Sequence, residues 1–287
     1  MSPQTIGLIA NTAKPGAKEL LGQLQAAFVR AGVTTLMEKE TAALIGTKSS
    51  QTIAQVSDAA DLLVVLGGDG TILQVVSCLH EIKPILGINI GSLGFLTCVS
   101  SSDYREAVEA IVSGQISLSD RVLLAVEITR GGARTAAMLA LNDAVLSRGE
   151  VSRLIRLRTR VNGEALTDFN ADGLVIATPT GSTAYSLSAG GPILAPQSGV
   201  FVITPICPHV LTNRSLIVED SSVIEVEPGE PDYPIYLTID GRSPVLLEFG
   251  SVVRIRRSDK ILPLAVLPQM SFFSVVRQKL KWSGSTI

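Results

Sequence analysis

The chain has 287 residues, with 24 Lys and Arg against 26 Asp and Glu, and only 17% of its residues are charged. This balance excludes a polybasic nucleic-acid-binding protein, and an apolar content of 46% excludes a disordered chain. The three cysteines are widely spaced and the N-terminus has no secretory signal pattern. We therefore expect a cytoplasmic protein with reduced thiols and no zinc site of the Cys/His type.

The first third of the chain alternates short apolar runs with helical patterns. Apolar spacing and flanking residues predict strands at 5–10, 33–37, 61–66 and 84–88, and helices at about 20–31, 50–60, 71–80 and 102–113. The run at 61–66 is continuously apolar, as in a central parallel strand that is buried on both faces. This alternation predicts an α/β N-terminal domain with a parallel, Rossmann-like sheet at residues 1–115.

After about residue 115, strand-like runs follow one another with little helix between them. Arg156, Arg158 and Arg160 alternate with less polar residues, and Asn162-Gly163 follows as a strong hairpin signal. Further strand-like runs lie at 174–178, 200–206, 223–226, 235–239, 245–249 and 252–255. These runs predict an all-β C-terminal domain at residues 116–269. A last apolar pattern at about 270–287 is expected to pack back on the first domain.

The longest stretch without Asp, Glu, Lys or Arg runs from Gly173 to Asn213. A membrane-spanning helix needs about 20 predominantly apolar residues. This stretch is interrupted by prolines, glycines and many hydroxyl residues, so we reject a membrane span.

The first chemical motif is the turn Gly67-Gly68-Asp69-Gly70-Thr71, directly after an apolar strand and before a helix. Glycines let the backbone approach a ligand closely, and a helix N-terminus suits phosphate. Asp69 in that turn suits magnesium binding or proton acceptance from an attacking hydroxyl. The alternative is a plain Gly-Asp-Gly turn with Thr71 as a helix cap. Leu73 breaks the G-x-G-x-x-G pattern of dinucleotide-binding enzymes.

The second motif is Asn142-Asp143, a polar pair inside an apolar run. Such a pair is costly to bury unless it is hydrogen-bonded, and its side chains suit a ribose or an amide. A hairpin turn is the equally weighted alternative.

The third motif is the densest: Asp172-Gly173 precedes a strand, and the run Thr178-Pro179-Thr180-Gly181-Ser182-Thr183-Ala184-Tyr185-Ser186-Leu187-Ser188-Ala189-Gly190-Gly191-Pro192 follows it. Small hydroxyl residues and glycines suit a polyhydroxylated or phosphorylated ligand. A structural Ser/Thr-rich loop is the alternative, although a long charge-free irregular stretch is more often a site.

These three motifs, in this order and spacing, resemble those of the ATP-dependent NAD kinase family of bacterial type. The GGDGT turn alone is shared with diacylglycerol and sphingosine kinases, whereas the segment from Thr178 to Pro192 is much more specific. The likeness extends to Leu211-Thr212-Asn213-Arg214 and the region of Trp282, so it covers nearly the whole chain.

The resemblance implies an enzyme that transfers the γ-phosphoryl group of ATP to the 2′-hydroxyl of the adenosine ribose of NAD, making NADP. It implies that NAD binds between the two domains and that Mg²⁺ arrives with ATP. Asp69 would be the catalytic base, and the glycines of the GGDGT turn would cradle the phosphates. The residues that the resemblance assigns to NAD are Phe95, Asn142, Asp143, Asp172, Thr183, Ala184, Tyr185, Ser186, Leu187 and Ser188.

Asn170, Arg153 and Arg242 are weaker candidates for the same site. Relatives often have Arg where this chain has Asn170, which leaves open how the NAD phosphates and the choice between NAD and NADH are handled. Relatives usually form dimers or tetramers in which a neighbouring subunit completes the site. The strand at 202–209 resembles that contributing segment, so a homodimer or homotetramer is expected.

Two other functions stay open from the sequence alone. A GGDGT-type lipid kinase would need a membrane-surface element, against which the acidic net charge and the lack of a basic amphipathic helix count. A non-catalytic dinucleotide-binding regulator would not need the intact Asp69. The sequence leaves the donor range, the metal preference, allosteric control and the oligomeric state open.

Overall fold

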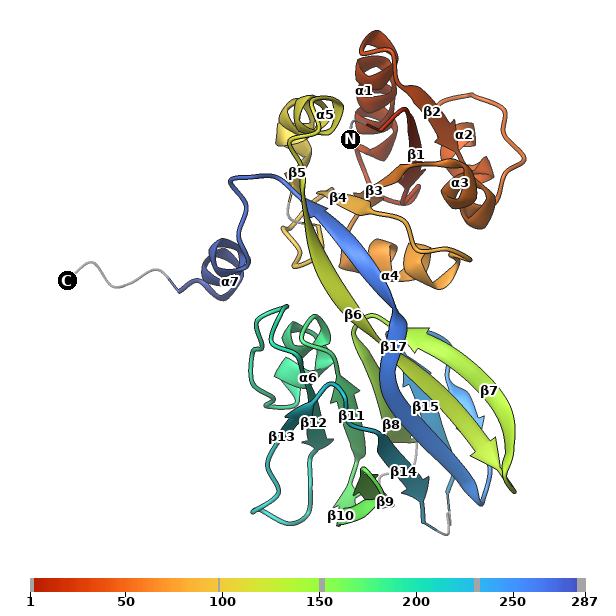
Figure 1. Cartoon of the computed structure of the whole chain (residues 1–287), viewed down its shortest axis with the longest axis vertical. Coiled ribbons are helices and arrows are strands. Elements are labelled where there is room, and N and C mark those ends of the chain that lie inside the picture. Colours follow the sequence, from red (N-terminus) through yellow and green to blue (C-terminus); the bar gives the residue numbers. More distant parts are fainter. Residues whose placement is uncertain (1–2, 98, 150–152, 230–232, 283–287) are drawn as a thin grey trace, which may run out of the picture. The chain divides into compact units, whose positions relative to one another are not determined.

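The computed structural model describes residues 3–97, 99–149, 153–229 and 233–282, and divides into two compact units (Figure 1). Unit 1 comprises residues 1–120 and 262–287, and unit 2 comprises residues 121–261. The division falls inside two long strands, β6 (Ser117–Arg130) and β17 (Ser251–Val266), which therefore contribute residues to both units.

Unit 1 alternates strands and helices. Its strands are β1 (Thr5–Ala10), β2 (Thr34–Met37), β3 (Leu62–Gly67), β4 (Ile85–Asn89) and β5 (Val99–Ser100). Its helices are α1 (Ala17–Arg30), α2 (Lys39–Leu44), α3 (Ile53–Ala59), α4 (Asp69–Ser77), α5 (Tyr104–Val112) and α7 (Phe272–Leu280), with a 3₁₀ turn at Ser101–Asp103.

The strands of unit 1 form a parallel sheet in the order β2-β1-β3-β4, and Leu264 of β17 pairs in parallel with Ile85 of β4. Helices α1 and α5 contribute to the core on one face of this sheet. On the other face, a Cβ at Gly7 would lie 2.8 Å from Val56 of α3, and one at Gly87 would lie 2.7 Å from Ile72 of α4. The two glycines let these helices approach the sheet closely, and the α/β prediction is confirmed.

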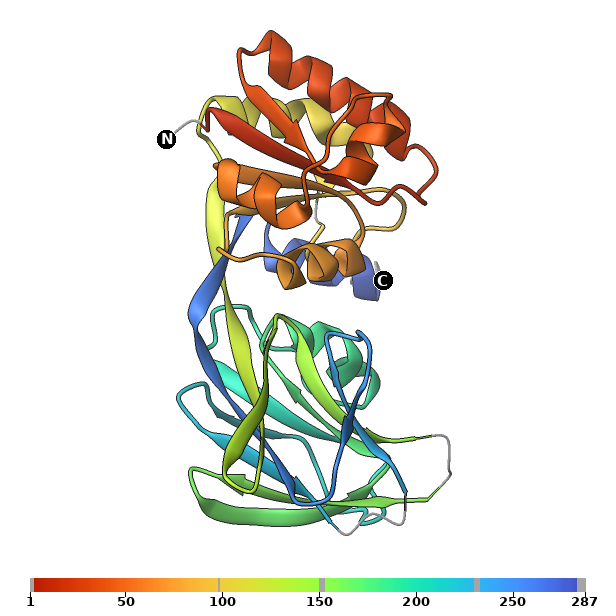
Figure 2. The ribbon, with the colours of Figure 1, turned by 90° about the vertical axis from the view of Figure 1, so that its right-hand side faces the viewer.

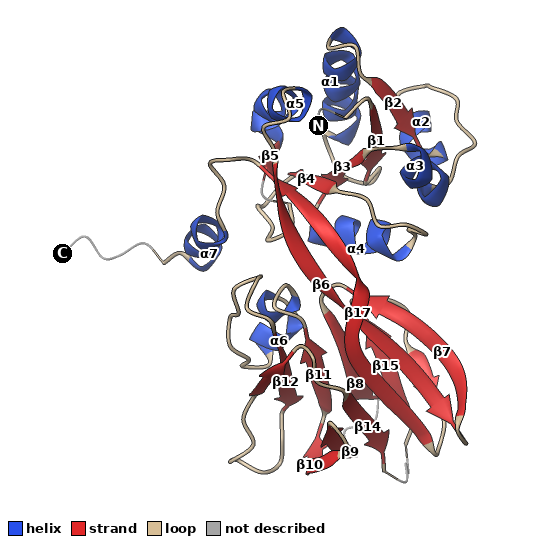
Figure 3. Cartoon of the chain, viewed as in Figure 1, coloured by secondary structure: helices blue, strands red, loops and turns tan. Residues whose placement is uncertain are grey.

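Unit 2 consists mainly of strands, as Figure 3 shows in red. They are β7 (Ala133–Ala140), β8 (Asp143–Arg148), β9 (Ile155–Val161), β10 (Glu164–Ala171), β11 (Gly173–Ala177), β12 (Val200–Ile206), β13 (Leu216–Glu219), β14 (Ile224–Pro228), β15 (Ile235–Ile239) and β16 (Val245–Leu247). A 3₁₀ turn at Gly181–Thr183 and the short helix α6 (Tyr185–Ser188) follow β11.

Two sheets enclose the core of unit 2. One has the antiparallel order β13-β12-β11-β8-β15-β16, and the other contains β10-β9-β14-β17 with β6 and β7. A single buried cluster takes residues from both, among them Leu146 and Ile176 from the first and Leu157 and Val226 from the second. The predicted all-β domain is therefore a sandwich (Figure 2).

Local sequence signals identify most elements but not their ends. The Asn162-Gly163 turn is observed, with φ values of 52° and 81°, and β9 alternates buried and exposed residues as predicted. Helix α2 is absent from the prediction: its N-cap, Glu38, accepts hydrogen bonds from the backbone of Glu40 and Thr41. No helix in the described part of the chain is long and apolar enough to cross a membrane.

Candidate functional site

The GGDGT turn joins the carboxyl end of β3 to the first turn of α4, where ligands collect in open α/β sheets. Gly68 is the N-cap residue, and its N–H donates to the Thr71 hydroxyl at 3.3 Å. A Cβ added at Gly68 or Gly70 would meet nothing within 4 Å, so the space beside this backbone is open. The turn therefore presents a helix N-terminus to which a phosphate has access.

The Asp69 carboxylate is held by the loop that follows β4. Its Oδ2 accepts a hydrogen bond from the N–H of Phe95 at 2.8 Å. Its Oδ1 accepts three, from the N–H of Leu96 at 3.0 Å and from both the N–H, at 3.0 Å, and the hydroxyl, at 3.1 Å, of Thr97. Because Oδ1 is fully used, Oδ2 is the oxygen with acceptor capacity left for a ligand.

Two further residues let the carboxylate take this position. A Cβ at Gly94 would lie 1.9 Å from Asp69 Oδ1, so only glycine fits there. Asn89, at the end of β4, donates from Nδ2 to the Thr97 hydroxyl at 2.8 Å, so the Thr97 hydrogen is directed to Asp69. The side chain of Phe95 is half-buried, and the Lys279 ammonium of α7 lies 6.0 Å from the centre of its ring.

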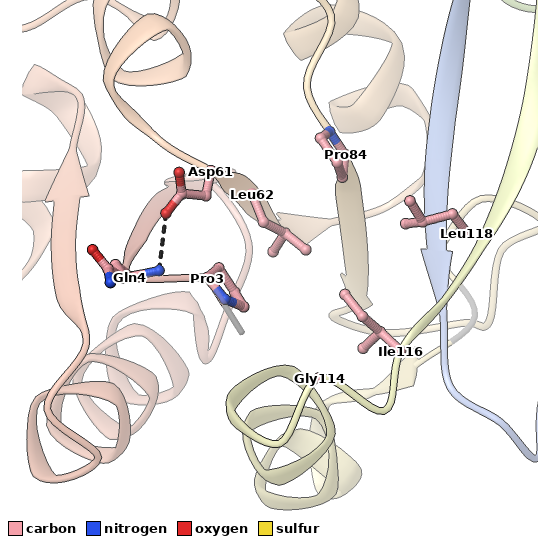
Figure 4. Close-up of a pocket in the computed structure, with 8 residues that line it drawn as sticks. All are labelled: Pro3, Gln4, Asp61, Leu62, Pro84, Gly114, Ile116 and Leu118. Atoms are coloured by element: carbon pink, nitrogen blue, oxygen red, sulfur yellow. Dashed lines mark hydrogen bonds between the residues drawn. The ribbon is translucent and has the colours of Figure 1, made fainter. Parts of the chain in front are cut away.

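A cavity of about 540 Å³ lies at the amino ends of the unit 1 strands, whereas the GGDGT turn follows the carboxyl end of β3 (Figure 4). It is lined by residues that precede the strands, including Gln4, Asp61 and Pro84. The Asp61 carboxylate accepts hydrogen bonds from the N–H groups of Gln4 and Thr5 at 2.9 and 3.0 Å. The cavity is thus at the amino ends of β1, β3 and β4, away from the GGDGT turn.

In unit 2, Asn142 and Asp143 lie where β7 ends and β8 begins, and both are buried. The hairpin alternative is wrong, because β7 pairs with β6 whereas β8 pairs with β11 and β15. Among the described residues, none donates a hydrogen bond to the side chain of Asn142 or Asp143. The polar ends of both side chains are therefore available to a ligand.

The backbone of this pair is bound tightly by the Thr178–Ser188 run. The N–H of Thr178 donates to the carbonyl of Asn142 at 2.9 Å, and its hydroxyl donates to the carbonyl of Leu141 at 2.6 Å. A Cβ at Gly181 would lie 2.0 Å from the Asn142 carbonyl oxygen. The conformation of the Asn142-Asp143 pair and that of the run are therefore set together.

Asp240 binds the same backbone from the other side. Its Oδ2 accepts from the N–H of Leu141 at 2.9 Å, and its Oδ1 accepts from the N–H groups of Asn142 and Asp143 at 2.7 and 3.1 Å. Burial, together with the nearby negative charge of Asp240, raises the pKa of Asp143 to about 7. Burial also raises the pKa of Asp240, although the three N–H groups act in the opposite direction.

The segment from Thr183 to Ser188 continues directly from this contact. Ser186 is buried, and its hydroxyl lies 3.0 Å from that of Thr204 on β12. Tyr185 is 46% exposed at the start of α6, so its ring is open to stacking. Thr183, Ala184 and Leu187 are partly exposed, and Ser188 is exposed.

Asp172 and Asn170 are not brought to this end of the sheet. Gly173 pairs with Ser147 and Ala177 with Asp143, so the two ends of β11 lie roughly 13 Å apart at the usual rise per residue. Asp172 instead pairs with Arg148, whose Nε lies 2.7 Å from its Oδ1. The Asn170 carbonyl accepts a hydrogen bond from the N–H of His209, so Asn170 and Asp172 lie near the end of β12.

The two arginines among the weaker candidates have structural contacts of their own. Arg153 is exposed and its guanidinium lies 5.3 Å from the centre of the Tyr233 ring. Arg242 donates to the carbonyls of Ile239 and Leu139, both at 3.3 Å.

The residues that support the candidates and are absent from the sequence-based site include Thr97, Arg148 and Asp240, which contact candidates directly, and Asn89, which contacts Thr97. Asn89 and Asp240 each carry a visible signal, because a polar residue ends an otherwise apolar strand-like run. The described residues contain no cluster of three or more His, Cys, Asp or Glu that could hold a metal ion.

Comparison with known proteins shows which family has these features. The model of the ATP-NAD kinase N-terminal domain matches residues 6–116, and that of the C-terminal domain matches residues 141–266. The NAD kinase of Syntrophotalea carbinolica is 40% identical over 96% of this chain and 98% of its own length. The NAD kinase of Solibacter usitatus is 41% identical over 97% of this chain and 98% of its own length.

Two solved structures have the same fold. The yeast NADH kinase complexed with NADH matches 100% of this chain and 90% of its own, with a TM-score of 0.92 and 27% identity. An NAD kinase from Archaeoglobus fulgidus in complex with ATP covers 98% of this chain and 100% of its own, with a TM-score of 0.76 and 23% identity. On the family models and the curated relatives together, the chain belongs to the ATP-NAD kinase family.

Proposed function

We propose that the chain is an NAD kinase in which Asp69 orients and deprotonates the 2′-hydroxyl of the NAD adenosine ribose. The ribose oxygen then attacks the γ-phosphorus of ATP: the new O–P bond forms, and the bond to the β-phosphate oxygen breaks. The products are NADP and ADP. Family membership supports the reaction, and the position of Asp69 at the start of α4 is the observation that carries the catalytic assignment.

The hydrogen bonds of Asp69 support Oδ2 as the oxygen that would act. Oδ1 accepts three hydrogen bonds and Oδ2 only one, so Oδ2 would accept the ribose hydroxyl. The loop donors hold the carboxylate in place, so little reorganisation is needed when the substrate binds. Orientation of the nucleophile is the larger part of this role, because phosphoryl transfer depends mainly on positioning and electrostatics.

The first turn of α4 would bind the ATP phosphates through Gly67, Gly68, Gly70 and Thr71. The open space beside Gly68 and Gly70 supports this assignment. Mg²⁺ prefers oxygen ligands and keeps several waters and substrate phosphates, so the ATP phosphates and water would supply its ligands without a cluster of carboxylates in the described residues. When bound with ATP, the ion would neutralise phosphate charge.

Residues of unit 2 would bind NAD. Asn142 and Asp143 would contact it with their available side chains, and the Thr183–Ser188 segment would contact it with hydroxyls, backbone and the Tyr185 ring. Phe95 in unit 1 would form an apolar wall. Arg153 and Arg242 remain weaker candidates for contacts with NAD.

A homodimer or homotetramer would explain the position of Asp172 and Asn170. These residues lie at the far end of β11, beside the 206–209 segment. The adjacent strand β13 is an edge strand with exposed Leu216 and Ile217. In such an oligomer, Asp172 would serve a neighbouring subunit. Light scattering of the purified protein measures the oligomeric state, and a monomer would refute this assignment.

A coupled assay of NADP formation tests the function, with NAD or NADH as acceptor and Mg-ATP or polyphosphate as donor. We expect NADP from NAD and Mg-ATP, and we expect Asp69→Asn to abolish turnover while the protein folds and binds NAD. Asp61→Asn is the matched control, because that carboxylate also accepts backbone hydrogen bonds but lies at the opposite edge of the sheet. Full activity of Asp69→Asn would refute the catalytic assignment.

The assay also separates the other two functions. Phosphorylation of diacylglycerol on liposomes without NADP formation would indicate a lipid kinase. Tight NADP binding without any phosphoryl transfer would indicate a regulator. The Asp69 carboxylate, held in place by backbone hydrogen bonds, counts against that function.

A further inference from the structure

We propose that Asp240 is a positioning residue for the NAD site, because its carboxylate fixes the backbone of Leu141–Asp143 and leaves the side chains of Asn142 and Asp143 free for the dinucleotide. This inference rests on the proposed NAD-binding role of those two residues.

The first support is the number and direction of the hydrogen bonds. One carboxylate accepts from three consecutive N–H groups, at 2.9, 2.7 and 3.1 Å. In return, the N–H of Asp240 donates to the carbonyl of Asp143 at 3.0 Å. Since Thr178 donates to the carbonyls of Leu141 and Asn142, the backbone polar groups of the pair are used internally.

The second support is burial together with backbone conformation. Asp240 is 8% exposed, and a buried carboxylate is retained only where donors compensate its desolvation. Its φ is 50° and that of Gly241 is 67°, so the chain turns sharply after β15. Asp and Asn both tolerate this left-handed region, which brings the carboxylate back over the start of β8.

The third support is that Asp240 also acts on the charge of Asp143. Asp143 begins β8, which lies between β11 and β15 (Figure 1). Strand β11 has no charged residue, and Tyr236 of β15 pairs with Ser147 at the other end of β8. Arg242 acts electrostatically on Asp240. Burial is the larger cause of the raised pKa of Asp143, and the charge of Asp240 adds to it, so both favour the protonated form of Asp143 near neutral pH.

The variant Asp240→Asn separates positioning from folding. Asparagine keeps one carbonyl oxygen, which preserves the two bonds of Oδ1, and tolerates the left-handed conformation. Its amide NH₂ would face the N–H of Leu141, so one of the three bonds is lost. The negative charge near Asp143 is lost as well. Asp240→Ala, which removes all three bonds, is the stronger variant if it folds.

Asp220→Asn is the matched control. Asp220 is equally buried at 8% exposed and lies in the same unit, but it pairs with Arg257 at 2.6 Å and has no hydrogen bond to the Asn142-Asp143 segment. Loss of a buried carboxylate in unit 2 is thereby tested without touching the proposed site.

The experiment measures the kcat and KM for NAD from pH 5.5 to 9, and follows the ¹³C carboxyl resonance of Asp143 during a pH titration. For Asp240→Asn we expect about a tenfold rise in KM for NAD, a change in kcat of less than about threefold, and a lower titration midpoint of Asp143. Asp220→Asn should leave all three at their wild-type values.

The outcomes distinguish this inference from the proposed function. A wild-type protein that makes no NADP would refute the function, and the titration of Asp143 would still report the effect of Asp240. An active wild type with an unchanged KM and an unchanged Asp143 midpoint in Asp240→Asn would overturn the positioning role alone. Equal effects of Asp240→Asn and Asp220→Asn would also overturn it, because they would indicate general destabilisation of unit 2.

Discussion

Asp143→Asn should stabilise the unliganded protein at neutral and alkaline pH. Asp143 is 4% exposed and receives no hydrogen bond from the described residues, so its ionised form is disfavoured in the fold. The difference between the ordinary pKa of 3.8 and the raised pKa of about 7 corresponds to about 4 kcal/mol. Asparagine has nearly the same shape and no charge, so the variant escapes this cost.

The sign follows from proton linkage. Below a pH of about 4, Asp143 is protonated in both states and contributes no pH-dependent difference. Between pH 4 and 7 the unfolded chain releases the proton while the folded chain keeps it, so the stability of the wild type falls as the pH rises. Above a pH of about 7 both states are ionised and the cost is constant. The free energy of unfolding of Asp143→Asn should therefore exceed that of the wild type by an amount that grows with pH.

The assay is urea unfolding at pH 5 and pH 8, followed by far-ultraviolet circular dichroism and by hydrogen exchange of the β8 and β11 amides. The advantage of Asp143→Asn should grow by about 2 kcal/mol or more between these two pH values. Asp220→Asn, which loses the ion pair with Arg257, should be less stable than the wild type at both. If the difference in the free energy of unfolding between Asp143→Asn and the wild type stays constant with pH, Asp143 is not a buried carboxyl group that lacks hydrogen-bond donors, and the reasoning is refuted.

Three further predictions concern residues that contact candidate site residues: Gly94 beside Asp69, Gly181 beside Asn142, and Arg148 beside Asp172. Gly94→Ala places a Cβ 1.9 Å from Asp69 Oδ1, so kcat should fall at least about tenfold with little change in KM for NAD. The control Gly22→Ala has nothing within 4 Å of its Cβ and should keep wild-type kinetics. Gly181→Ala brings a Cβ to 2.0 Å from the Asn142 carbonyl, so NAD affinity measured by calorimetry and the Tm should both drop; unchanged affinity would contradict the coupling of these two segments. Arg148→Ala removes the ion-pair partner of Asp172. Because both side chains are partly exposed, the free energy of unfolding should change by less than about 1 kcal/mol, while KM for NAD should rise. An unaltered KM would exclude Asp172 from the site.

The sequence predicts the fold class because hydrophobic periodicity is a local property. The apolar run before Gly67 identifies β3, and the alternation around Arg158 identifies a half-exposed strand. Helix α2 is missed because its stabilisation comes from a cap: the carboxylate of Glu38 accepts backbone hydrogen bonds that substitute for a long amphipathic pattern. Helix α4 begins at Asp69 and not at Thr71, and there the Thr71 hydroxyl accepts a hydrogen bond from the N–H of Gly68, the N-cap residue.

The sequence predicts only part of the candidate site, because local patterns identify the candidate residues but not the residues that hold them in place. Asp69, Asn142 and Tyr185 stand out by local pattern. Asn89 and Asp240 each end an apolar run, but their roles depend on contacts with residues 8 and about 100 positions away, which no local pattern encodes. The separation of Asp172 from Asp143 is likewise a matter of strand register, because it follows from which ends of β8 and β11 pair.

The environments of the two site carboxyls argue for different chemical roles. Asp69 is surrounded by donors, with four hydrogen bonds from Phe95, Leu96 and Thr97, so it is held as an acceptor with one oxygen left to use. Asp143 is buried beside another carboxylate without a donor of its own, so near neutral pH it can offer a proton to a carbonyl or accept one from a hydroxyl. A base must keep its acceptor oxygen oriented during turnover, whereas a binding residue needs only to match its ligand. The donor-rich position therefore suits catalysis, and the donor-free position suits recognition of NAD.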